Sequence, residues 1–125
     1  MILDTCAVLW FAFERAQLTD ATIDTIEHSD SVRISTLSFW EIGINVRKKK
    51  LVMPIGVDEL AQLFIRNESV ELVAPDIAIV SRALELDWPH RDPIDRMIVA
   101  TALKYDDWIA TGDTAISSFY PKTMR

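Results

Sequence analysis

The stretch Asp92–Asp113, DPIDRMIVATALKYDDWIATGD, decides the fold. Proline directly after aspartate is typical of a helix start, and apolar residues recur at helical spacing from Pro93 to Tyr105. The segment WIATG that follows predicts a short buried strand. A helix that leads straight into a strand is one unit of an alternating chain. The stretch therefore predicts a parallel sheet covered by helices.

The same alternation continues outward from this stretch. Strands are predicted at residues 1–5, 32–35, 70–74 and 108–112, with helices between them and after the last one. The helix predicted at 36–50 is expected to carry four apolar side chains toward the core: Leu37, Trp40, Ile44 and Val46. We expect an α/β fold with one domain over residues 1–125. Its central parallel sheet should have about four strands, with helices on both faces.

Composition excludes several classes of protein. The chain has 125 residues, half of them hydrophobic, and a net charge of −6. This argues against the broad basic surface of a typical nucleic-acid binder. It leaves open an enzyme that acts on nucleic acid, because an acidic site itself lowers the net charge. The single cysteine, Cys6, excludes an internal disulfide and favours a reducing, cytoplasmic location. No signal peptide or membrane span is expected.

Four carboxylates are predicted to lie at one edge of this sheet. In a parallel sheet, the carboxyl ends of the strands and the starts of the following helices share an edge. Asp4 ends the first strand and Asp113 follows the fourth. Glu41 lies about one turn into the helix after the second strand, and Asp95 begins the helix that leads back to the fourth. All four should therefore converge.

Simpler interpretations exist for three of the four. Asp95 could complement the helix dipole, Glu41 could be a surface residue, and Asp113 could belong to a turn. Asp4 is harder to dismiss, because a buried carboxylate without a partner is costly. Four converging carboxylates cannot all stay ionised unless a cation joins them, and a hard divalent ion such as Mg²⁺ or Mn²⁺ prefers oxygen ligands. Zinc is disfavoured, since Cys6 and two distant histidines give no ligand spacing.

The chain resembles the PIN domain family, specifically the VapC-type toxin ribonucleases of bacterial toxin–antitoxin pairs. The resemblance rests on four segments: LDT at 3–5, SFWEI at 38–42, HRDPIDRMIVATAL at 90–103 and ATGDTAISSFY at 110–120. It implies an Mg²⁺- or Mn²⁺-dependent endoribonuclease that hydrolyses RNA phosphodiester bonds. It also implies a homodimer and a small VapB-type antitoxin. The implied acidic ligands are Asp4, Glu41, Asp95 and Asp113.

Further residues near these segments have weaker assignments. Asp92 is expected to cap its helix and to orient the site. Arg91 and Arg96 are candidates for steering phosphate, or for pairing with a carboxylate. Thr111 could contact a water molecule or orient Asp113.

Two questions stay open at this point. The basic run at 47–50 fits either RNA binding or a solvated helix end. The main alternative function is a PIN-like fold that binds RNA or protein without cleaving it. A dehalogenase-like phosphatase fits less well, because it requires an aspartate where this chain has Cys6. A cleavage assay with and without chelator separates the metal-dependent ribonuclease from the PIN-like fold that does not cleave.

Overall fold

A computed structural model describes residues 1–125. Five parallel strands form one sheet in the order β3-β2-β1-β4-β5. The elements in chain order are β1 (Ile2–Leu3), α1 (Thr5–Phe13), the 3-10 helix η1 (Arg15–Gln17), α2 (Asp20–His28), β2 (Val32–Ser35), α3 (Thr36–Arg47), α4 (Val57–Ile65), β3 (Val70–Val73), α5 (Ile77–Glu85), α6 (Pro93–Tyr105), β4 (Ile109–Ala110), α7 (Thr114–Phe119) and β5 (Thr123–Met124). The predicted α/β class is confirmed.

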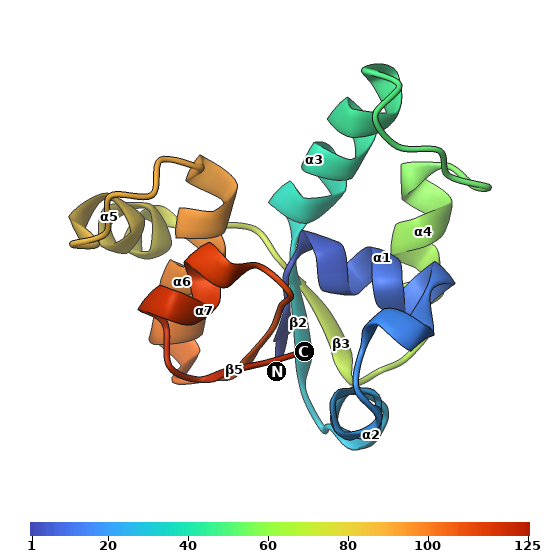
Figure 1. The fold of residues 1–125 in the computed structure, drawn as a ribbon, viewed down its shortest axis with the longest axis horizontal. Coiled ribbons are helices and arrows are strands. Elements are labelled where there is room, and N and C mark those ends of the chain that lie inside the picture. The colour runs from blue at the N-terminus through green and yellow to red at the C-terminus, as the bar shows by residue number, and fades with distance from the viewer.

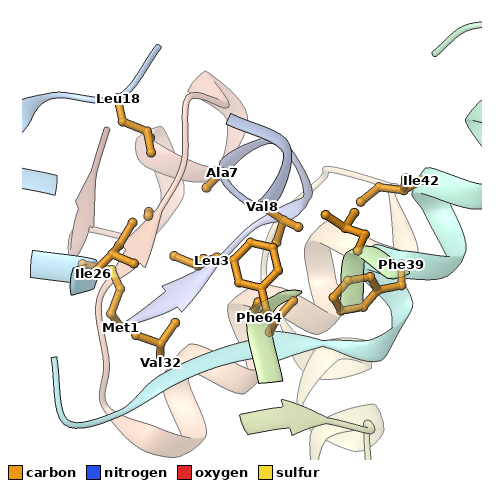
Figure 2. Packing of buried hydrophobic residues seen from close by; sticks show 13 residues of the cluster. Met1, Leu3, Ala7, Val8, Leu18, Ile26, Val32, Phe39, Ile42 and Phe64 are labelled. Atoms are coloured by element: carbon orange, nitrogen blue, oxygen red, sulfur yellow. The ribbon is translucent and has the colours of Figure 1, made fainter. Parts of the chain in front are cut away.

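Alternate residues of the short central strands bury opposite faces of the sheet. Leu3 and Ala110 belong to a cluster with α1, α2, α3 and α4, whereas Ile2 and Ile109 belong to a second cluster with α6 and α7. Figure 1 shows these helices on the two sides of the sheet, and Figure 2 shows the packing of the first cluster. Successive side chains of a strand point to opposite faces of the sheet. A strand of only two residues therefore contributes one side chain to each cluster.

Capping side chains mark most of the strand-to-helix turns. Asp4, Ser35 and Asp113 each end a strand or its extension, and each accepts a hydrogen bond from a backbone N–H in the first turn of the next helix. Thr19 caps α2, and the predicted cap of α6, Asp92, is also present. Such a cap satisfies N–H groups that would otherwise lack a partner. These turns fix the start of each helix at the carboxyl edge of the sheet.

The structure corrects two expectations. The sheet has a fifth strand, β5, because the backbone of the C-terminal residues pairs with β4 although its side chains are only half-buried. Trp40 and Val46 are expected to face the core, but 63% and 37% of their surfaces are exposed, while Phe39 and Ile42 are buried instead. The apolar stripe of α3 is therefore rotated from the predicted one. No helix is long and apolar enough to cross a membrane.

Candidate metal and catalytic site

Asp4 is the most deeply buried carboxylate of the chain. It leaves β1 directly and has only 3% of its surface exposed. Its Oδ1 accepts the backbone N–H of Ala7 at 2.7 Å, and its Oδ2 accepts the hydroxyl of Thr111. No cationic side chain pairs with it. Burial raises the pKa of Asp4 to about 6, with smaller upward contributions from Asp95 and Asp113, while its hydrogen bonds lower it.

Thr111 connects the first strand to the last carboxylate of the site. It follows β4 and is buried. Its hydroxyl oxygen donates to Asp4 and accepts the backbone N–H of Asp113 at 2.9 Å. Asp113 in turn accepts the N–H of Ala115 at 2.7 Å and begins α7. One hydroxyl therefore sets the relative position of two carboxylates that are far apart in sequence.

Asp95 reaches the site from the first turn of α6. Asp92 caps that helix by accepting the N–H groups of Ile94 and Asp95 with one oxygen. The Oδ2 of Asp95 lies 2.7 Å from Nε2 of His90. Burial raises the pKa of Asp95, and the negative charges of Asp92 and Asp113 raise it further, whereas His90 lowers it. Asp92 therefore has the capping role that the sequence predicts.

Glu41 approaches from the second turn of α3. Burial raises its pKa, the nearby Thr5 hydroxyl lowers it, and the charges of Asp92 and Asp95 raise it again. The negative charges of Asp92 and Asp95 at the start of α6 therefore reach Glu41 on α3.

Cys6 provides an independent view of the same arrangement. Its thiol pKa is raised to about 11, first by burial and then by four negative charges, which are those of Asp4, Glu41, Asp113 and Asp95. The negative charges of all four carboxylates therefore reach one position in α1. They are neighbours rather than a closed ligand set, because no three His, Cys, Asp or Glu side chains are close enough together to hold a metal ion. Three of the four are oriented by the hydrogen bonds described above.

The chemistry of these donors, though not their spacing, nevertheless suits a hard divalent cation. All four groups offer carboxylate oxygens, which Mg²⁺ and Mn²⁺ prefer. Asp4 is buried near other negative charges and has no cationic partner in the chain. This arrangement lowers the stability of the folded protein unless a cation binds there.

The two arginines beside Asp95 have different environments. Arg96 donates to four backbone carbonyls, those of Ala83, Leu86, Trp88 and His90, at 2.6 to 3.0 Å. These bonds hold the α5–α6 loop and occupy the guanidinium group, so the structure gives Arg96 a role other than steering phosphate. Arg91 is exposed and belongs to no ion pair, so it stays a candidate for that role.

His90 is the residue that sequence reasoning missed. Its distance from the other histidine and from Cys6 disfavours a zinc site, and it stands only five residues before Asp95. Its ring lies against Trp88, with centroids 4.6 Å apart, and Trp88 stacks on Phe119 of α7 at 4.7 Å. A histidine shortly before a capped acidic helix start was the available signal.

Comparison with known proteins adds a family to this geometry. A model of the PIN domain family matches residues 1–120. The chain is similar to ribonuclease VapC22 of Mycobacterium tuberculosis, with 26% identity over 118 residues that cover 94% of this chain and 90% of that protein.

Two solved structures share the fold. A toxin–antitoxin complex from Klebsiella pneumoniae superimposes with a TM-score of 0.67 at 16% identity, covering 99% of this chain and 95% of that one. VapBC2 from Rickettsia felis, bound to a DNA fragment from their promoter, has a TM-score of 0.67 at 12% identity, covering 99% and 96%.

Proposed function

The chain belongs to the PIN domain family, and from this premise we propose that it is a divalent-metal-dependent endoribonuclease, the toxin of a toxin–antitoxin pair. The similarity to a protein named as a ribonuclease supports the reaction class. The observation that carries the proposal is Asp4, a buried carboxylate among like charges with no cationic partner. Such a group is expensive to maintain for stability alone.

In this proposal, Asp4, Glu41, Asp95 and Asp113 hold Mg²⁺ or Mn²⁺. When bound, the ion supplies Lewis-acid charge to the phosphate and to the attacking water. The chain's own residues prepare the site. Thr111 fixes Asp4 relative to Asp113, and His90 fixes Asp95. Because Asp4 is shielded from solvent, its interaction with a cation is stronger than it would be in water.

The proposed partners are RNA as substrate, a small VapB-type antitoxin and a second copy of the chain. The two structural neighbours, which are a toxin–antitoxin complex and a VapBC complex, support the antitoxin. We expect growth arrest on induction of the protein alone, and relief on co-expression of an adjacent small reading frame. Induced protein that is harmless and captures no such neighbour would contradict the toxin role without affecting the nuclease role.

The nuclease role is tested by RNA cleavage with manganese, with excess chelator, and with Asp4→Asn. Asparagine has nearly the shape of aspartate but is a poor ligand for a hard cation. We expect chelation and Asp4→Asn each to remove most cleavage. The exposed Asp87→Asn is the matched control and should cleave like wild type. If wild type still cleaves RNA in excess chelator, the metal-dependent mechanism is refuted. If wild type does not cleave RNA with manganese, the nuclease function is refuted.

A further inference from the structure

Helix α3 ends in four exposed cationic residues, Arg47, Lys48, Lys49 and Lys50, which we call the α3 cap. The end of the helix is well built. The N–H of Lys49 donates to the carbonyl of Val46 at 3.0 Å, and the N–H of Lys50 donates to that of Asn45 at 2.9 Å. This pair of bonds is the Schellman motif, and it requires a left-handed residue at the first position beyond the helix cap. The four cations are therefore held in a defined turn.

Lys49 occupies that left-handed position, with φ of 58°. Glycine adopts this conformation without a steric penalty, whereas a residue with a Cβ atom does not. The attraction of cations to a helix C-terminus explains Arg47 and Lys48 in the last turn and cap. It does not explain a lysine where glycine is the more stable choice. The side chain at this position therefore costs stability rather than adding it.

Most other cations of the chain are already engaged. Of the 13 Lys and Arg residues, six form ion pairs or hydrogen bonds within the chain: Arg15, Arg33, Arg96, Lys104, Lys122 and Arg125. Four of the remaining seven are the consecutive residues of the α3 cap. In a chain of net charge −6, this is where free positive charge concentrates.

The α3 cap lies on the same helix as Glu41. Figure 1 shows α3 rising beyond the sheet, with its C-terminal end at the top of the view. Lys48 lies seven positions after Glu41, which corresponds to roughly 10 Å along the helix axis. A few nucleotides of an RNA strand span this distance.

We propose that the α3 cap binds the phosphate backbone of single-stranded RNA and holds the strand against the acidic site. The inference rests on the proposed nuclease function. The chain carries a net charge of −6, which repels a phosphate chain, so positive charge beside the site strengthens the binding of a strand. Contacts with phosphate are electrostatic and independent of sequence, and they weaken as salt rises.

The first test measures binding of a labelled mixed-sequence single-stranded RNA oligonucleotide, in chelator so that no cleavage occurs. The variant is Lys48→Gln with Lys50→Gln. The control is Lys104→Gln with Lys122→Gln, which removes the same charge from exposed ion pairs outside the α3 cap. We expect affinity to fall about five- to tenfold in the cap variant only. The slope of log affinity against log salt should flatten by about 0.7 for each lysine removed. Equal affinities of the two variants would overturn the proposal.

The second test uses Lys49→Gly, which should move stability and RNA affinity in opposite directions. The melting temperature should rise by a few degrees, because glycine relieves the left-handed backbone. RNA affinity should fall about two- to threefold, with a correspondingly smaller change in salt slope. A higher melting temperature with unchanged RNA affinity would show that the α3 cap is only a helix end.

Cleavage with manganese, measured in parallel, separates this inference from the function on which it rests. If wild type cleaves RNA, and the cap variant binds and cleaves it like the control, only the proposal that the α3 cap binds RNA is overturned. Wild type that neither binds nor cleaves RNA overturns both.

Discussion

The hydroxyl of Thr111 donates a hydrogen bond to the buried carboxylate of Asp4, joining residues 107 positions apart. The same oxygen accepts the N–H of Asp113. Because β1 and β4 are neighbours in the sheet, the ends of these strands lie side by side, and one threonine can orient carboxylates from both. The geometry of the site thus depends on the order of the strands.

Thr111→Val should destabilise the metal-free protein by roughly 1–3 kcal/mol, because it leaves a buried carboxylate oxygen and a backbone N–H without partners. Thr101→Val is the matched control. Thr101 is equally buried, but its hydroxyl donates only to the carbonyl of Met97 within α6. Urea unfolding should show a clearly larger loss for Thr111→Val. Equal losses would mean that the bond to Asp4 contributes nothing specific.

The raised pKa of Asp4 predicts how stability depends on pH. The folded pKa of about 6 lies above the ordinary aspartate value of 3.8, so the folded state favours the protonated form. Without metal, this group's contribution is most favourable below about pH 4. As pH rises to about 6, the contribution of Asp4 to the free energy of unfolding falls by up to roughly 3 kcal/mol. Asp4→Asn cannot titrate, so its stability relative to wild type should rise over this range. The free energy of unfolding of both proteins is measured in urea at several pH values between about 4 and 6. If it changes with pH in the same way for both, the burial of an uncompensated Asp4 is contradicted.

His90→Ala should weaken manganese binding about 10- to 100-fold, because Asp95 loses the hydrogen bond that orients it. The control is His28→Ala, since His28 is exposed and bonds only the carbonyl of Asp24 in its own helix. Calorimetric titration of metal-free protein with manganese measures the effect directly. If both variants bind manganese like wild type, the contact between His90 and Asp95 has no part in holding the ion.

Much of the fold followed from sequence because local signals and the global arrangement agree. The cap Asp92 follows from residue type alone, and strand β2 has its predicted bounds. Strand β5 was not, because Thr123 and Met124 pair through backbone atoms and carry no periodic pattern. The exposure of Trp40 also depends on how α3 packs, which its mixed apolar pattern does not fix.

The candidate site divides in the same way. Placing the four carboxylates at one edge needed only the alternation of strands and helices. The contact of His90 with Asp95 depends on the course of the α5–α6 loop, which Arg96 sets through four carbonyls. Such a contact arises from tertiary structure, and its only signal in the sequence is a histidine five residues before Asp95.

The central claim is that the acidic cluster is built for a divalent cation, and thermal unfolding tests it most directly. Wild type and Asp95→Asn should each be melted with chelator and with saturating manganese. We expect manganese at about 100 times its dissociation constant to stabilise wild type by roughly 2.7 kcal/mol, which raises its melting temperature by about 10 °C. Asp95→Asn should melt higher than wild type in chelator, because repulsion is relieved, and should gain little from manganese. A wild-type melting temperature that manganese does not change would contradict the claim.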